Sequence, residues 1–351
     1  MEHMKKIKHK KLWTVLLIIL AAVVILLACN WHLVKMVVRN VFQVSIEIDE
    51  SEWEGGTSYL GVVYAEDSES QYLNLYVPDT DSDEELPLII LVHGGGFITN
   101  DLECEQPMKM YRYFRDHGYA CATINYRLAQ EEEWPGAVED VKAAIRYLRA
   151  NAEVYGYSAD DFTIWGESAG AYIASMAAVT TDDEFDGVSF VGEEDLEESV
   201  SAEVSTLIEF YGCLDVFVME DEFTELGIPL FVHEIANSWL DKDIMEGYDT
   251  VQEFWFRREF EEFTEEDALL YKPIYYLEKN AQEKADLEIY IWHGNYDLTV
   301  PYLQTVNFAS EAAEILGEDA VYYELFEGYV HADDRFYTEE QLDELLALLQ
   351  E

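Results

Sequence analysis

The stretch FTIWGESAGAYIASMAAV, residues 162–179, joins an apolar run to a run of small residues through a Gly-x-Ser-x-Gly turn. The apolar run is typical of a buried strand, and the small residues that follow predict a helix. Between a strand and a helix, this motif predicts a strained turn that lifts Ser168 above a sheet, with Gly166 and Gly170 keeping side chains out of its crowded surroundings. The helix N-terminus would add a positive field at the hydroxyl. A glycine-rich turn with an incidental serine is the alternative.

Strands and helices alternate along most of the chain. Residues 59–66 and 71–79 predict two antiparallel strands around a turn. Continuous apolar runs then predict buried strands at 86–94, 119–128, 162–165, 204–212, 287–294 and 321–328. Helical spacing of apolar residues occurs at 134–156, 308–317 and 338–350. This order predicts an α/β protein with a mostly parallel central sheet and helices on both faces.

One long segment breaks the alternation. About 70 residues separate the strands predicted at 204–212 and 287–294, and residues 235–263 within this segment are rich in aromatic side chains. We expect this aromatic part to be helical, and we expect residues 217–285 to form a cap insertion over the carboxyl edge of the sheet. An ordinary extra layer of helices is the alternative. With this insertion, residues 41–351 are predicted to form one catalytic-size domain.

The chain is strongly acidic, with 73 acidic and 21 basic residues and a formal net charge of −52. Such a surface repels phosphate backbones, so the composition argues against binding to nucleic acid. Four cysteines in 351 residues do not make a disulfide framework, and no Cys-x-x-Cys spacing indicates a structural zinc site. The acidic surface indicates solubility in a salty or extracellular medium.

Residues 1–40 form a separate basic head and apolar segment. Five lysines precede residues 12–29, which contain no charge. Eighteen helical residues span roughly 27 Å, just enough to cross a thin bilayer. The preceding lysines predict a cytoplasmic N-terminus and an extracytoplasmic catalytic domain, on a single-pass anchor in the cell membrane. A cleaved signal peptide of a secreted protein, and a lipoprotein with a lipidated Cys29, are the alternatives.

The run HGGGF, residues 93–97, follows a predicted strand and needs a physical reason for its three glycines. Attack of Ser168 on an ester carbonyl would place negative charge on oxygen, and backbone N–H groups without neighbouring side chains would stabilise that charge. A phosphate-binding loop is the competing interpretation, but no Gly-Lys-[Ser/Thr] follows, and the protein is acidic. We expect His93 to make local hydrogen bonds.

A serine nucleophile needs a base, and the base needs an acid to orient it. His331 lies in a loop after the last predicted strand, and Asp297 follows the strand before it. The chain order Ser168, Asp297, His331 is the order of α/β-hydrolases. His293, at a strand end, is expected to be structural. Three other residues remain candidates for the orienting acid: Asp215, Asp333 and Asp334. Of these, Asp215 follows the strand predicted at 204–212.

Six motifs together resemble the hormone-sensitive-lipase-like carboxylesterases, a group that includes bacterial esterases related to feruloyl and acetyl-xylan esterases. They are HGGGF 93–97, NYRL 125–128, EDVKAAIRYLR 139–149, GESAG 166–170, HGNYDLTVP 293–301 and the Gly-x-x-His of 328–331. The resemblance implies an α/β-hydrolase fold, no metal and no cofactor. It further implies an oxyanion hole built from the amides of Gly95, Gly96 and Ala169.

The chain departs from this group in two places. Relatives build a cap largely from N-terminal helices, whereas here the N-terminal residues form the apolar segment 12–29. Val330 replaces a bulkier aromatic residue before the histidine, which is a mild change of packing. The first departure leaves the acyl-chain specificity open.

Three functions fit these motifs. The first is a serine carboxylesterase that hydrolyses short- to medium-chain esters of small molecules or saccharides, and an exported location would suit the deacylation of polysaccharide fragments or dietary esters. The second is a serine peptidase of the same fold, although the HGGGF loop favours esters. The third is a non-catalytic binding protein, but such relatives typically lose the nucleophile or the base. The sequence leaves the oligomeric state open.

Overall fold

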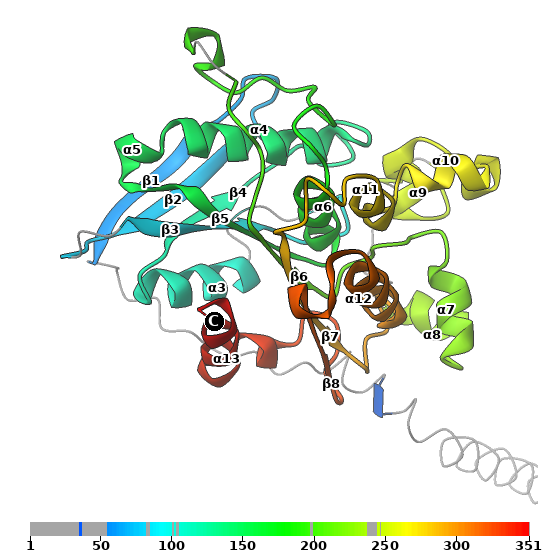
Figure 1. The fold of residues 1–351 in the computed structure, drawn as a ribbon. Coiled ribbons are helices and arrows are strands. Elements are labelled where there is room, and N and C mark those ends of the chain that lie inside the picture. The colour runs from blue at the N-terminus through cyan, green and yellow to red at the C-terminus, as the bar shows by residue number, and fades with distance from the viewer. Residues whose placement is uncertain are drawn as a thin grey trace, which may run out of the picture.

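The computed structural model describes residues 35–36, 55–81, 85–99, 102, 105–196, 199–236, 244–245 and 247–350. Eight strands form one twisted sheet in the order β1-β2-β4-β3-β5-β6-β7-β8 (Figure 1). Strand β2 pairs antiparallel with both β1 and β4, and the other neighbours pair parallel. The strands are β1 Gly56–Val63, β2 Tyr72–Pro78, β3 Leu86–Val92, β4 Ala120–Ile124, β5 Tyr157–Glu167, β6 Thr206–Phe210, β7 Glu288–Gly294 and β8 Val321–Phe326. The predicted α/β class with a mostly parallel sheet is confirmed.

Helices cover both faces of the sheet (Figure 1). One face carries α3 Glu105–Asp116 and α13 Glu339–Leu349; the other carries α4 Gly136–Ala150, α5 Ala152–Tyr155, α6 Ala169–Val179, α11 Pro273–Lys279 and α12 Leu303–Leu316. Because helices cover both faces, β3 and β4 are buried along almost their whole length. This burial explains why their sequences are continuous apolar runs. Short 3-10 turns complete the chain at Glu193–Asp195, Phe260–Glu262, Glu318–Ala320 and Asp334–Tyr337.

Two predicted helices are shorter in the structure. The helical pattern of 134–156 breaks at Asn151, and α5 ends at Gly156 in a left-handed conformation with φ 91°. Residues 235–263 were expected to be helical, and in the described part of this segment residues 235–236 and 251–256 are α-helical. Helix α9 covers only Val251–Phe256, because Arg257 turns left-handed at φ 53° and donates to the carbonyl oxygen of Ala129, 2.6 Å away.

The segment expected to be a cap consists of short helices. They are α7 Met219–Glu225, α8 Leu230–Ala236, α9, α10 Glu265–Leu269 and α11. Figure 1 shows α9 and α10 beyond the end of α6, and α7 and α8 beside α12. Whether this segment acts as a cap, within a single domain of residues 41–351, stays a prediction.

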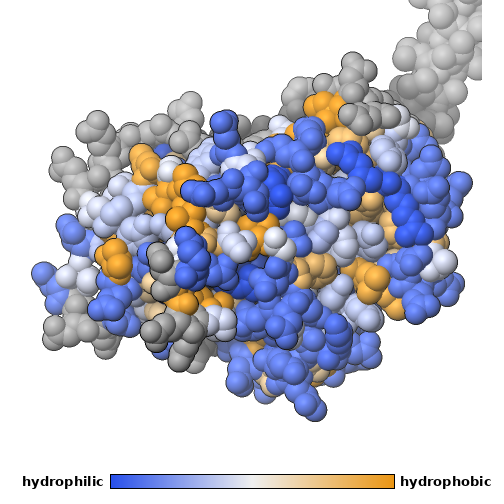
Figure 2. Space-filling view, turned by 90° about the horizontal axis from the view of Figure 1, so that it is seen from above, coloured by the Kyte–Doolittle hydropathy of each residue, from blue (hydrophilic) through white to orange (hydrophobic). Residues whose placement is uncertain are grey.

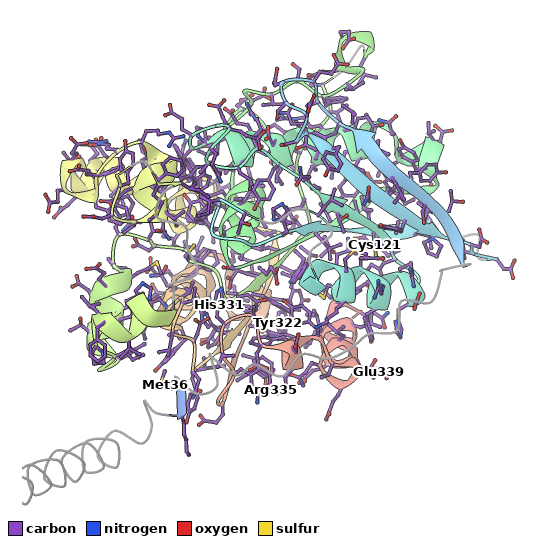
Figure 3. All side chains as sticks on the ribbon, turned by 180° about the vertical axis from the view of Figure 1, so that it is seen from behind. Met36, Cys121, Tyr322, His331, Arg335 and Glu339 are labelled. Carbon is purple, nitrogen blue, oxygen red and sulfur yellow. The ribbon has the colours of Figure 1, made fainter. Side chains whose placement is uncertain are left out.

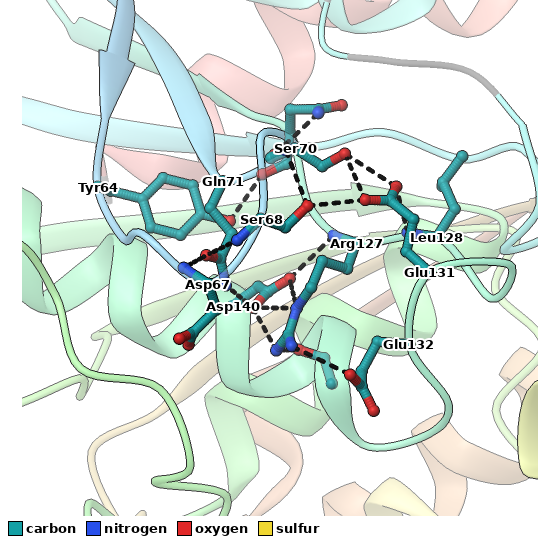
Figure 4. Close-up of polar contacts among 12 residues, drawn as sticks. Tyr64, Asp67, Ser68, Ser70, Gln71, Arg127, Leu128, Glu131, Glu132 and Asp140 are labelled. Atoms are coloured by element: carbon teal, nitrogen blue, oxygen red, sulfur yellow. Dashed lines mark hydrogen bonds and ion pairs between the residues drawn. The ribbon is translucent and has the colours of Figure 1, made fainter.

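A buried ion pair ties the NYRL stretch to α4 (Figure 4). The Arg127 side chain donates to both carboxylate oxygens of Asp140, at 2.8 and 3.0 Å, and the Arg127 backbone N–H adds a third bond. Gln71 at the start of β2 donates to the same carboxylate at 2.7 Å. Burial raises the pKa of Asp140, and the hydrogen bonds from Arg127 oppose that rise. The network therefore gives a buried carboxylate enough partners to remain charged.

The surface matches the composition. Figure 2 shows a face covered mostly by hydrophilic residues, with smaller hydrophobic patches between them. In the described part of the chain, no helix is long and apolar enough to cross a membrane. The predicted anchor at 12–29 and the candidate lipidation site Cys29 lie outside the described residues. Cys121 and Cys213 are buried and free.

Candidate active site

Ser168 lies at the sharp turn between β5 and α6, with φ 53° and ψ −121°. This left-handed backbone is strained for a residue with a Cβ atom, and such strain concentrates at functional sites. The turn is possible because both flanking glycines have no side chain. A Cβ on Gly166 would lie 2.3 Å from the carbonyl oxygen of Gly170, and one on Gly170 would lie 2.3 Å from that of Val92. The two glycines of the motif thus allow backbone segments to pack directly on one another.

The structure brings Ser168, His331 and Asp297 together from three separate parts of the chain. The Nε2 atom of His331 lies 2.9 Å from the Ser168 Oγ, and its Nδ1 atom lies 2.7 Å from an Asp297 carboxylate oxygen. His331 lies in the loop after β8, near the middle of the molecule in Figure 3. Its side chain is 14% exposed and that of Asp297 is fully buried, so the histidine is partly accessible and the acid is shielded from solvent.

Four donors surround the Asp297 carboxylate. Its Oδ1 accepts the backbone N–H groups of Thr299 at 2.7 Å and Val300 at 2.9 Å. Its Oδ2 faces His331 and also lies 3.2 Å from the Nε2 atom of His293. Burial alone would raise the pKa of Asp297, but the charge of His331 and the hydrogen bonds from both histidines lower it below its ordinary value. The site therefore holds a charged carboxylate behind the imidazole.

The alternative acids are engaged elsewhere. Asp215 pairs with Lys272 at 2.5 Å, and its backbone N–H donates to Gln304. Asp333 accepts the Val330 N–H at 3.1 Å and pairs with Arg335. Asp334 pairs with Lys109 at 2.5 Å. The geometry thus favours Asp297 as the partner of His331.

The glycine run lies against the nucleophile turn. A Cβ on Gly94 would lie 3.2 Å from the Ser168 Cβ, so only glycine allows this approach without a shift of the backbone. Gly95, Gly96 and Phe97 all have positive φ, at 116°, 60° and 65°. Three such residues in succession curl the loop and explain the glycines after His93.

Three amides near this turn are available as donors. Among the hydrogen bonds that join described residues, none uses the backbone N–H of Gly95, Gly96 or Ala169. Ala169 is the first residue of α6, where helix geometry leaves N–H groups without intrahelical acceptors. These are the three amides that the sequence suggested for an oxyanion hole.

His93 and His293 have local roles in the structure. The Nδ1 atom of His93 lies 2.7 Å from the Gly94 carbonyl oxygen, and its ring stacks on Tyr126 at 4.4 Å. His293 is fully buried, and its Nδ1 atom lies 3.0 Å from Thr305 Oγ1. His293 thus contacts the acid, an interaction that its position at a strand end did not indicate.

Sequence reasoning also missed a buried acid beside the nucleophile. Glu167 accepts hydrogen bonds from the phenols of Tyr211 at 2.7 Å and Tyr337 at 2.6 Å, and the two phenols also contact each other. Burial raises the pKa of Glu167, and these bonds oppose the rise. The Tyr211 ring lies edge-on to the His331 ring, with centroids 4.9 Å apart. The only hint in the sequence was the charged residue inside GESAG.

One aromatic side chain of the 217–285 segment, Trp255, reaches the glycine loop. The Phe97 ring stacks on Trp255 of α9 at 4.1 Å and meets Tyr172 of α6 edge-on at 5.9 Å. These aromatic rings give one side of the glycine loop an apolar surface. In the part of the chain that the structure describes, no group of three or more potential ligands could hold a metal ion.

Comparison with known proteins assigns the family. A family model described as BD-FAE matches residues 73–312, about two-thirds of the chain. The chain belongs to the BD-FAE family. The matched region includes the glycine loop, Ser168 and Asp297, and it ends before His331.

Curated relatives of this BD-FAE chain carry esterase names. It is 23% identical to a probable carboxylic ester hydrolase, LipM of Mycobacterium tuberculosis, over 75% of the chain and 54% of the relative. It is 31% identical to esterase LipQ of the same organism, over 46% of the chain and 36% of the relative. The chain thus spans about half or less of the length of these relatives.

Solved structures establish the fold as that of the α/β-hydrolases. A truncated carbohydrate esterase from gut microbiota superposes with a TM-score of 0.64 at 23% identity, over 86% of this chain and 97% of the other. An inhibited esterase B of Lactobacillus rhamnosis superposes with a TM-score of 0.56 at 17% identity, over 94% of this chain and 95% of the other. The α/β-hydrolase fold expected from the motifs is confirmed.

Proposed function

We propose that this chain is a serine carboxylesterase that hydrolyses short- to medium-chain carboxylic esters. The observation that carries the proposal is the continuous array from Ser168 Oγ through His331 to Asp297, at 2.9 and 2.7 Å. Nucleophile, base and orienting acid at these distances are what acyl transfer to serine requires. The esterase names of the relatives support the same reaction class.

In this mechanism His331 acts as a neutral base. It takes the Ser168 proton at Nε2 as Oγ attacks the ester carbonyl, and it later returns that proton to the leaving alcohol. Asp297 keeps the other ring proton on Nδ1 and stabilises the imidazolium that forms. Water then attacks the acyl-enzyme with the same base, which releases the carboxylic acid and restores Ser168.

The oxyanion formed in each attack is held by the amides of Gly95, Gly96 and Ala169. These donors are fixed before reaction by the positive-φ loop and by the start of α6, so they need little reorganisation as charge develops. The position of Ala169 at a helix N-terminus adds a favourable field.

We infer that the ester is carried by a small molecule or a saccharide. Solved structures of the same fold are described as a carbohydrate esterase and as an acetyl ester-xyloside bifunctional hydrolase, which supports acetylated sugars as substrates to test. No step of the proposed reaction uses a metal or a cofactor.

The test is hydrolysis of p-nitrophenyl esters from acetyl to palmitoyl, together with acetylated and feruloylated xylo-oligosaccharides. We expect turnover of the short esters and at least a 10³-fold loss of kcat in Ser168→Ala. A folded protein that hydrolyses none of these esters, or a Ser168→Ala variant that keeps most of the activity, would contradict the proposal.

We further propose that residues 12–29 anchor the chain in the cell membrane, with the catalytic domain on the outer side. The uncharged run behind five lysines supports this location. Fractionation of cells, followed by protease treatment of intact cells, tests it. Catalytic domain that stays in the cytosolic fraction would contradict the anchor, and domain that sediments with membranes but resists external protease would contradict its orientation.

A further inference from the structure

Met36 is buried against residues that lie far from it in the chain. Its side chain is 1% exposed and belongs to a small buried apolar cluster, separate from the two main cores. In Figure 3, Met36 lies below His331, at the edge of the molecule. The other buried members of this cluster are Phe223, Ile228, Val232, Tyr296, Leu298 and Val330.

Half of these partners flank the acid and the base. Tyr296 and Leu298 are the two neighbours of Asp297 in the chain, and Val330 directly precedes His331. Three residues of the acid and base loops thus share one apolar cluster with a residue that lies 260 positions or more before them in the chain.

Hydrogen bonds stiffen the same cluster. The Tyr296 N–H donates to the Tyr329 carbonyl oxygen at 2.8 Å, which joins the acid loop to the base loop. The Nδ1 atom of His233 on α8 lies 3.0 Å from the Leu298 carbonyl oxygen. The acid loop is therefore held from two sides by polar contacts and from a third by apolar packing that includes Met36.

We propose that Met36 is a positioning residue, which holds the acid and base loops at the spacing that proton transfer needs. The inference rests on the esterase mechanism proposed above. It makes Met36 part of the working enzyme: processing at Cys29 would leave activity intact, because Met36 is retained, whereas loss of residues through 36 would lower activity.

The expected effect follows from the short distances in the array. Contacts of 2.7 and 2.9 Å tolerate little movement, and a displacement of about 1 Å in an active site can cost about 100-fold in rate. Alanine at 36 leaves space into which the loops can relax, and aspartate places a charge against apolar side chains. Leucine keeps most of the apolar volume.

The test compares three full-length variants, Met36→Ala, Met36→Asp and Met36→Leu, with wild type on p-nitrophenyl acetate. We expect kcat to fall about tenfold in Met36→Ala and further in Met36→Asp, with KM within about twofold. Met36→Leu should restore kcat to within about twofold of wild type. Thermal unfolding of each variant is measured in parallel.

The matched control is Met110→Ala, because Met110, a residue of α3, is equally buried but packs in a different cluster. We expect it to lower the melting temperature and leave kcat within about twofold of wild type. An unchanged kcat in Met36→Ala, or a loss of kcat in Met110→Ala as large as that in Met36→Ala, would overturn the positioning role. Wild-type chain without Ser168-dependent hydrolysis would overturn the proposed function, and this inference with it.

Discussion

Replacing Asp297 by asparagine should disable the base through its tautomer. Oδ1 of Asp297 accepts the backbone N–H groups of Thr299 and Val300, which cannot turn away, so the amide oxygen of asparagine must stay there. The amide NH2 group then faces His331 Nδ1, which can only accept. The His331 proton moves to Nε2, where a lone pair is needed to take the Ser168 proton.

The loss should be large. In a triad of this geometry the wrong histidine tautomer costs about 10⁴ in kcat, or about 5.4 kcal/mol at about 1.36 kcal/mol per factor of ten. The assay is kcat for p-nitrophenyl acetate, with circular dichroism and thermal unfolding to show that Asp297→Asn is folded. The two backbone hydrogen bonds to position 297 are preserved, so we expect the fold to survive.

Asp215→Asn is the matched control, because Asp215 was the leading alternative acid. Its side chain is 28% exposed and paired with Lys272, so its loss should change kcat by no more than about threefold. A folded Asp297→Asn variant that keeps more than a tenth of wild-type kcat would refute the reasoning. So would an Asp215→Asn variant that loses more activity than Asp297→Asn.

Three further predictions concern packing and pH. Gly170→Ala should destabilise the fold by about 3 kcal/mol or more, because the new Cβ meets backbone atoms. Gly156→Ala should cost only about 1 kcal/mol, because its φ is 91° but its new Cβ meets no neighbouring atom. Equal melting temperatures of the two variants would contradict this. Burial raises the pKa of Glu209 to about 8. The folded state therefore keeps this carboxyl protonated to a higher pH than the unfolded chain does, and the free energy of unfolding should fall as pH rises from about 4.5 to 8. Glu209→Gln should flatten that fall in urea unfolding at pH 5 and 8, and an unchanged difference would count against a buried protonated acid. kcat/KM should fall in acid, because a histidine must be neutral to act as the base, while Asp297, with its lowered pKa, stays charged. A rate that is flat down to pH 4 would exclude a histidine base.

The fold was largely readable from the sequence because its buried parallel strands are short continuous apolar runs. Strands β3, β4, β6 and β7 begin and end within a few residues of those runs. The segment 235–263 was expected to be helical, and its described part is α-helical at residues 235–236 and 251–256. In the structure, aromatic side chains of this segment pack against other parts of the chain, as the stacking of Trp255 on Phe97 illustrates.

The sequence could propose the candidate triad because the chemistry demands particular residue types at loop positions, and the structure brings those three side chains together. Ser168, Asp297 and His331 each follow a strand, and parallel strands bring such positions to one edge of the sheet. Glu167 and Tyr337 could not be paired from the sequence, because their contact joins residues 170 positions apart. The contact of His293 with Asp297 depends on the local turn at 294–297, which no spacing rule specifies.

The most direct measurement of the central claim is covalent labelling with a p-nitrophenyl alkylphosphonate. Ser168 Oγ should form a bond to phosphorus and expel one p-nitrophenolate, which gives one equivalent of colour per protein chain. Peptide mass mapping should place the adduct on the peptide that contains Ser168, and Ser168→Ala should show neither colour nor adduct. Folded wild-type protein that forms no adduct, or forms it at another residue, would contradict the account.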